Sequence, residues 1–125
     1  MKKFNQYEKG YLECSIDAEG FLCITRNDRH NGHYGYELVL GWTNTKIEFL
    51  QKIKEILNIH NKIGVHNYRK GNQNPTFILH ISDSKILIEI LSQLKLVLKE
   101  GQRQIFLKLA PLIIRGKLTT VVKLR

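Results

Sequence analysis

The sequence runs twice through the same order of elements: two short segments with strand-like patterning, followed by one with helical patterning. The unit spans residues 21–58 and again residues 63–98. Its clearest strand covers residues 36–43, where large apolar side chains occupy every second position. Polar turns join the strands of each pair, which predicts two antiparallel hairpins. A helix before the first unit gives an α+β fold of order αββαββα, and one further helix is expected after the second unit.

Apolar residues at intervals of three and four predict the helices of the first half. The first helix covers residues 6–18 and ends at Gly20, a residue common at helix C-termini. The second follows an N-cap at Asn44 or Thr45 and continues through residue 57. A helix is therefore predicted on each side of the first hairpin.

The same spacing predicts two helices in the second half. Ser82 is expected to cap a helix whose apolar positions reach residue 98. A fourth helix begins with residues 102–109, and Pro111 is expected to kink or restart it. The tail, residues 116–125, has no clear assignment.

Helices that cover one face of a four-stranded antiparallel sheet leave its other face open. The strands are expected at residues 21–27, 36–43, 62–69 and 76–81. Simple solvation is the ordinary role of such a face, but a two-stranded ribbon can also present side chains to bases in a DNA major groove. The open face is predicted to carry Cys23, Thr25, Asn27, Glu37, Val39, Gly41, His66, Tyr68, Lys70, Thr76, Ile78 and His80.

The chain is strongly basic, with 20 Lys and Arg against 11 Asp and Glu and a formal charge of +9 over 125 residues. Such a charge on one predicted domain, residues 1–125, favours a polyanionic partner, either nucleic acid or an anionic membrane surface. No predicted helix combines a basic face with an exposed aromatic stripe, so a membrane-surface role is disfavoured. No apolar run is long enough to span a membrane, and no signal peptide is expected.

Two cysteines, Cys14 and Cys23, stand apart from any CxxC pair. Their spacing to His30 and His33 matches no closed zinc site. We expect both thiols to be reduced, in an intracellular compartment such as the cytoplasm or an organelle.

Residues 12–20, LECSIDAEG, resemble the signature motif of the LAGLIDADG homing endonucleases. Five positions match outright, and Glu19 replaces the final acid of the motif conservatively. The motif ends a helix, leads directly into a strand and opens the αββαββα order that characterises this family. Two further segments are similar to family segments, TNTKIEFLQKIKEIL and LVLKEGQRQIFLKL. The resemblance covers almost the whole chain and implies a saddle-shaped sheet.

The resemblance implies an acid at position 19 that binds Mg²⁺ or another divalent cation such as Mn²⁺, assisted by the backbone carbonyl of Ala18. Hard cations take oxygen ligands and activate water for phosphodiester hydrolysis. A solvated acid is the simpler role for Glu19, although the helix dipole disfavours an acid at a helix C-terminus. Asp17 corresponds to the first acid of the motif, which has a structural capping role.

Four more residues correspond to family positions near the scissile phosphate. Asn44 matches a polar residue near the attacking water, and an N-cap is its equally reasonable role. Lys99 matches a lysine near the phosphate and Gln102 a nearby polar residue. Lys46 is a weaker candidate, because its alignment needs a gap. For each lysine a solvated surface position is the ordinary alternative.

Single-motif members of this family work as homodimers, so the resemblance implies a homodimer on a long pseudo-palindromic double-stranded DNA site. Leu12, Cys14, Ser15 and Ile16 are expected at the dimer interface, whereas Glu13 is larger than the family's residue there. Hairpin-turn residues such as Arg29 and His30 are expected to contact DNA. The implied activity is a double-strand break made by an intron-encoded enzyme.

Two other functions stay open from the sequence. The same fold could serve an RNA-splicing maturase or a cleavage-dead nucleic-acid-binding protein. Alternatively, the chain could be an unrelated basic α+β interaction module whose motif is a coincidence.

Overall fold

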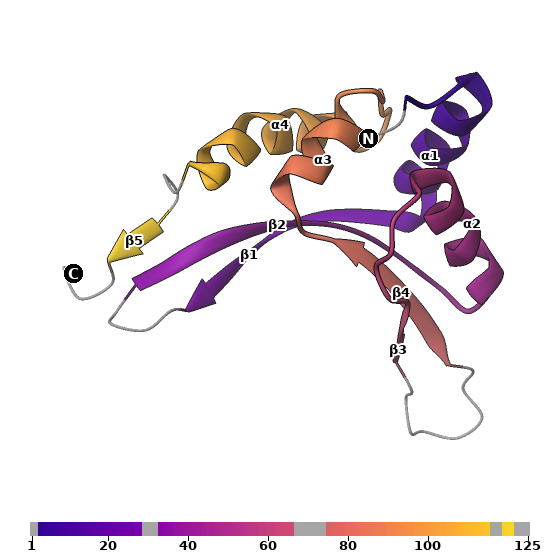
Figure 1. Ribbon diagram of the computed structural model, residues 1–125, viewed down its shortest axis with the longest axis horizontal. Coiled ribbons are helices and arrows are strands. Elements are labelled where there is room, and N and C mark those ends of the chain that lie inside the picture. Colours follow the sequence, from indigo (N-terminus) through magenta and orange to yellow (C-terminus); the bar gives the residue numbers. More distant parts are fainter. Residues whose placement is uncertain (1–2, 29–32, 67–74, 116–118, 122–125) are drawn as a thin grey trace.

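The computed structural model describes residues 3–28, 33–66, 75–115 and 119–121, and the side chains of residues 27–28, 33–34 and 119–121 are outside that description. Helices and strands follow the predicted order, with one further short strand, β5 (Figure 1). The elements are α1 (Gln6–Glu19), β1 (Gly20–Asp28), β2 (His33–Asn44), α2 (Ile47–Leu57), β3 (Gly64–His66), β4 (Thr76–Ile81), α3 (Ser84–Leu91), α4 (Glu100–Ile114) and β5 (Thr119–Val121).

Strand β2 is the centre of the antiparallel sheet, whose order is β1-β2-β4-β3. Strand β1 pairs along its whole length with one edge of β2, from Gly20 opposite Trp42 to Asp28 opposite Tyr34. The other edge pairs with β4 near one end and with β5 near the other. The tail thus supplies a strand that the sequence left unassigned, and it covers an edge that would otherwise expose unpaired backbone groups.

All four helices lie on one face of the sheet, and the two ends of the sheet bend away from them (Figure 1). The predicted α+β architecture with one open face is confirmed, and that open face is concave. The core lies between the helices and β2, where Leu38, Leu40 and Trp42 are fully buried. The alternation read along residues 36–43 therefore identified the helix-covered face.

Helix α1 begins with a capping box, in which Asn5 and Glu8 each accept a hydrogen bond from the other's backbone N–H. It ends at Gly20, as predicted, but this residue has an extended backbone (φ −91°) rather than the left-handed one typical of C-terminal glycines. A Cβ at Gly20 would lie 2.8 Å from the Cα of Ile16 and 3.2 Å from the Gly41 carbonyl oxygen. Glycine is needed there because the chain leaves α1 close against the helix backbone and beside the Gly41 carbonyl of β2.

Two predicted helix caps are wrong. The N-cap of α2 is Lys46, and the Asn44 side chain instead accepts a hydrogen bond from the Lys46 backbone N–H at 2.8 Å while Asn44 ends β2. Asp83, not Ser82, caps α3, because its carboxylate accepts from the backbone N–H groups of Lys85 and Ile86. Strand β2 extends one residue further than predicted, to Asn44, whereas β4 ends at Ile81 as predicted.

The third helix is also shorter than predicted, since α3 ends at Leu91 and not near residue 98. Residues 95–99 cannot continue it, because their backbone N–H groups donate to carboxylate side chains instead of to helix carbonyls. Helix α4 starts at Glu100 and continues through Pro111, so the expected restart at the proline does not occur. Among the described residues, no helix has the length and apolar character needed to cross a membrane.

Ser15 links α1 to the sheet inside the core. Its hydroxyl accepts a hydrogen bond from the Trp42 indole N–H at 3.1 Å and donates to the Leu12 carbonyl at 2.9 Å. Replacement of Ser15 by alanine leaves a buried indole N–H without an acceptor, which costs about 1–3 kcal/mol of unfolding free energy. Urea denaturation of Ser15→Ala measures this loss. Ser92→Ala, which removes an exposed hydroxyl, should change stability far less, and equal losses would contradict the prediction.

Candidate active site and nucleic-acid interface

The C-terminal end of α1 carries the predicted catalytic acid. Glu19 is the last residue of the helix, and both it and Ala18 are exposed. The carbonyl oxygen of Asp17, in the last turn of the same helix, accepts a hydrogen bond from the Lys99 ammonium at 2.6 Å. Lys99 is 82 residues away from Asp17 in the chain. The fold therefore brings the predicted lysine to the helix end that carries the predicted acid.

Asn44 lies at the same end of the sheet. Gly20 of β1 pairs with Trp42 of β2. Glu19 directly precedes Gly20, and Asn44 follows Trp42 by two residues, so both lie near this pair. Lys46 and Gln102 are exposed and lie at the starts of α2 and α4. Sheet register and the Lys99 contact thus group Glu19, Asn44 and Lys99, while Lys46 and Gln102 are solvent-facing residues of two neighbouring helix starts.

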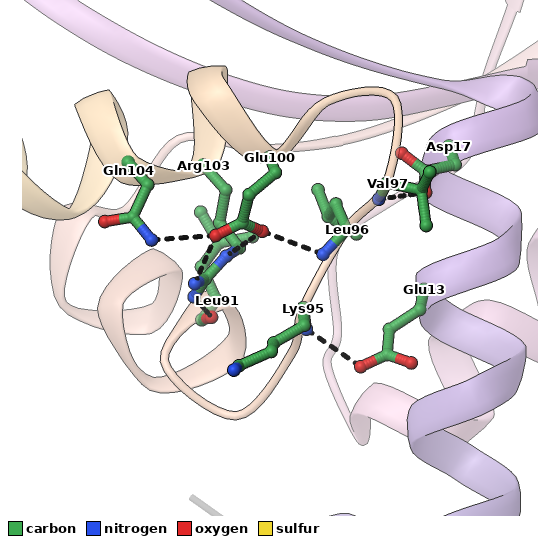
Figure 2. Close-up of polar contacts among 9 residues, drawn as sticks. All are labelled: Glu13, Asp17, Leu91, Lys95, Leu96, Val97, Glu100, Arg103 and Gln104. Carbon is green, nitrogen blue, oxygen red and sulfur yellow. Dashed lines mark hydrogen bonds and ion pairs between the residues drawn. The ribbon is translucent and has the colours of Figure 1, made fainter.

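A chain segment next to this site, residues 95–99, is held by carboxylates along its whole length. Figure 2 shows the contacts of Lys95, Leu96 and Val97. Asp17 accepts from the backbone N–H groups of Val97, Leu98 and Lys99 at 2.7–3.1 Å. Glu13 accepts from Lys95 and Glu100 from Leu96, each at 2.8 Å. Asp17 therefore has a structural role, in which it holds the loop that leads into α4. Glu13 turns toward this segment, which accounts for a large acid at a position where small residues were expected.

Glu100 and Arg103 fasten the other side of the segment. Arg103 is buried, with 6% of its surface exposed, and its guanidinium donates to both carboxylate oxygens of Glu100 and to the Leu91 carbonyl. Hydrogen bonds from Arg103, then from the Leu96 backbone and Gln104, lower the pKa of Glu100 to about 2. The same pairing raises the pKa of Arg103. The sequence analysis missed this pair, although a Glu and an Arg three apart at a helix start was a usable signal.

The opposite face of the sheet is the candidate nucleic-acid interface. In the described strands, the predicted open-face residues do lie on the face away from the helices. Each of them either pairs with another predicted open-face residue or alternates along its strand with a buried residue. Thr25, His66 and His80 are exposed, and the rest with described side chains are half-buried apart from Gly41. The half-buried residues are Cys23, Glu37, Val39, Thr76 and Ile78. For Asn27 only the backbone is described, and Arg29, His30, Tyr68 and Lys70 lie outside the described residues.

Gly41 lies on this face, as predicted, but it is not exposed. It is buried, and a Cβ there would lie 2.3 Å from the ring of Phe21, its partner across the β1–β2 pair. The Phe21 ring therefore covers the glycine, a cross-strand arrangement in which an aromatic side chain fills the space that glycine leaves. Phe21 is an open-face residue that the sequence analysis missed, because it stands at the very start of its strand.

Three of the four residues predicted at a dimer interface are instead core residues of this chain. Leu12 and Ile16 are fully buried, and Ser15 is buried against Trp42. The reason is helical geometry: these residues face the sheet, and the outward side of α1 carries the small residues Gly10, Cys14 and Ala18, of which only Cys14 was predicted. The prediction is wrong for Leu12, Ser15 and Ile16.

The outward side of α1 borders an apolar groove that it shares with segment 95–99. Val97 and Leu98 project from that segment with 85% and 74% of their surfaces exposed. Such exposure is unusual for adjacent large apolar side chains. The groove is lined by Gly10, Glu13, Cys14, Asp17, Ala18, Lys95, Val97 and Leu98.

Oxygen atoms at the end of α1 suit a hard divalent cation. Mg²⁺ is commonly held by one or two protein carboxylates together with phosphates and waters. Among the described residues, no three His, Cys, Asp or Glu side chains gather in one cluster. Glu19 and the carbonyl of Ala18 fit the sparser donor set, in which a nucleic-acid phosphate completes the coordination.

No protein-family model matches the chain, and no curated protein sequence matches it. Several solved structures are similar to it. The chain is similar to the archaeal intron-encoded homing endonuclease I-Vdi141I complexed with DNA, with a TM-score of 0.70 and 23% identity over 88% of this chain and 70% of that one. It is also similar to the homing endonuclease I-CvuI in complex with a DNA target in the presence of Mg, with a TM-score of 0.64 and 22% identity over 90% and 71%.

A third similar structure is the LAGLIDADG homing endonuclease I-LtrWI bound to its target DNA. Its TM-score is 0.70, with 18% identity over 89% of this chain and 39% of the other. At these identities the likeness establishes the fold. The chain has the α+β fold of the LAGLIDADG homing endonucleases, as the motif at residues 12–20 indicated.

The Glu100–Arg103 pair makes stability depend on pH in a defined window. The pKa of Glu100 falls from 4.5 to about 2 on folding, so its charged form is stabilised in the folded state. That contribution is complete above pH 4.5 and is lost as the pH falls toward 2. The difference in unfolding free energy between wild type and Glu100→Gln, measured by denaturant titration, should therefore be constant near neutrality and shrink over this window. A difference independent of pH would contradict it.

Proposed function

We propose that this chain, which has the LAGLIDADG homing-endonuclease fold, is a site-specific DNA endonuclease that acts as a homodimer. One observation carries the proposal: the exposed acid Glu19 stands at the end of α1, beside the Lys99 contact and at one end of an open, concave sheet face. Solved proteins of this fold are complexed with DNA, and the formal charge of +9 suits the same partner.

The chemistry that we propose is metal-dependent phosphodiester hydrolysis. Glu19 and the Ala18 carbonyl would hold a divalent cation, Mg²⁺ or Mn²⁺. When bound, the cation would polarise the scissile phosphate and lower the pKa of an attacking water. Lys99 would supply positive charge to the phosphate from a position fixed by the Asp17 carbonyl. Asn44 would orient water through its amide, and Lys46 and Gln102 would contribute at the margin of the site.

A second copy of the chain is part of this proposal, because one acid per chain serves one strand and a double-strand break needs two. The outward side of α1 suits self-association. Gly10, Cys14 and Ala18 are small and recur every four residues, so two helices could approach closely. Val97 and Leu98 flank them with exposed apolar surface. A two-fold axis along these helices would bring two Glu19 side chains together over one pseudo-palindromic DNA site.

An intron is the proposed genetic context, in keeping with the intron-encoded neighbour I-Vdi141I. The maturase alternative shares the fold and the charge. Nothing about a pure RNA or DNA binder requires an acid at the end of α1, where the helix dipole disfavours one. The position of Glu19 therefore favours the nuclease.

Glu19→Gln should abolish cleavage and leave DNA binding nearly unchanged, because the substitution removes an anionic ligand and keeps the basic surface. The assay is digestion of a randomised DNA library with Mg²⁺ and sequencing of the cut ends, with affinity for a recovered site measured by fluorescence anisotropy. Glu48→Gln, on the exposed side of α2, is the matched control and should cut normally. Normal cutting by a pure Glu19→Gln preparation would reject the assigned acid. Tight RNA binding without cutting by wild type would favour the maturase.

Cys14 tests the proposed dimer axis. If the outward sides of two α1 helices pack together, a short bismaleimide should join two copies through Cys14, and denaturing gels should show a covalent dimer. Cys14→Ser should abolish that product, whereas Cys23→Ser should retain it, because Cys23 is half-buried on the open sheet face. A cross-link that depends on Cys23, or sedimentation as a monomer at micromolar concentrations, would contradict the arrangement.

A further inference from the structure

The open face of the sheet changes character with distance from Glu19. Strand β1 starts immediately after this acid, and its first open-face residues, Phe21 and Cys23, are apolar or weakly polar. Their partners on β2 are Gly41 and Val39. The next pair, Thr25 with Glu37, is polar. The part of the face nearest the proposed catalytic end therefore carries apolar side chains on β1 and β2, beside the polar residues Thr43 of β2 and His80 of β4, which pairs with Gly41.

Strand β4 adds one more apolar side chain to this part of the face, next to His80. Ile78 lies on the open face, opposite Thr43 of β2 on one side and Gly64 of β3 on the other. A Cβ at Gly64 would lie 3.1 Å from the Ile78 side chain, so the isoleucine extends over this glycine as Phe21 does over Gly41. Two large apolar side chains thus spread over glycines on the same face. We call Phe21, Val39 and Ile78 the apolar strip.

Large apolar side chains on a sheet usually pack against a covering layer, but no helix covers this face (Figure 1). All three residues of the apolar strip are half-buried by their strand neighbours and keep the remainder of their surface on the concave side. None of their side chains has a hydrogen-bond donor or acceptor. Against a base pair they could offer apolar contact and nothing else.

We propose that the apolar strip reads thymine C5-methyl groups in the base pairs nearest the catalytic end of the site. This inference rests on the proposed function and adds a substrate class to it: duplex DNA with thymine at these inner positions. In the major groove only thymine presents an apolar group, whereas G, C and A present hydrogen-bonding atoms. An apolar side chain pressed on those atoms would leave them unpaired and desolvated, which selects against the other bases.

The Phe21 ring has a defined place in this recognition. It lies flat enough on β2 to occupy the space of a Gly41 Cβ, with ring atoms 2.3–3.0 Å from that position. An alanine at residue 41 must displace the ring, since the atoms in conflict belong to a side chain and not to backbone. Gly41→Ala therefore alters the apolar strip while leaving the strand pairing in place.

Thymine-to-uracil replacement removes only the methyl group, so it tests the proposal directly. The probe is the tightest duplex recovered by binding selection from a randomised library, with binding measured without divalent cation so that no cleavage intervenes. Each inner thymine is replaced by deoxyuridine in turn. Loss of one buried methyl should weaken binding about fourfold. Replacement of thymines in the outermost part of the site should have less effect.

Protein variants connect the methyl effect to particular side chains. Val39→Ala should remove the thymine–uracil difference at one inner position, and Gly41→Ala should reduce it at the position nearest the catalytic end. Thr25→Ala, in the adjacent polar pair, is the matched control and should leave the inner differences intact. Unchanged melting temperatures would confirm that each variant is folded.

The outcomes separate this inference from the function on which it rests. Tight, selective duplex binding with no thymine among the inner positions, or with equal affinity for thymine and uracil there, would overturn the methyl-reading proposal alone. A chain that selects no duplex from the library would overturn the proposed function and this inference together. A uracil penalty that disappears in Val39→Ala and persists in Thr25→Ala would support it.

Discussion

Carboxylate side chains that accept backbone N–H groups hold the two halves of this structure together. Asp17 and Glu13 of α1 bind the backbone of residues 95–99, and Glu100 completes the set from α4. Charged acceptors make the stronger class of hydrogen bond, so this junction fixes where α3 stops, where α4 starts and where Lys99 points. Buried Arg103 stabilises Glu100 in turn. The proposed catalytic end depends on this junction, because Lys99 reaches the Asp17 carbonyl only through it.

The long strand β2 organises the rest. One of its faces supplies the fully buried core residues, and its other face supplies the centre of the open, concave surface. Two neighbouring glycines near the end of α1 mark close approaches, Gly20 against α1 and Gly41 beneath Phe21. The proposed endonuclease and the proposed thymine reading both use the same consequence: helices occupy one side of the sheet, so the other side is available to a duplex.

Side chains that the motif assigned to a dimer interface can be core residues in the fold. Leu12, Ser15 and Ile16 belong to the motif, yet they pack against the sheet. The outward side of α1 is formed by small residues of the helix instead. A motif read as a string does not say which residues face outward. Helical periodicity does, once the buried side is known.

Local sequence determined the element order, the alternation along β2, the acid at the end of α1 and the family likeness, because these depend on near-neighbour patterns and on a compact motif. Tertiary structure alone decided the early end of α3, the fifth strand and the Phe21–Gly41 contact. Each of those rests on groups far apart in the chain: carboxylates of α1 capture amides some 80 residues away, and the tail pairs with β2. Backbone hydrogen bonds satisfied at such distances leave no periodic trace in the sequence.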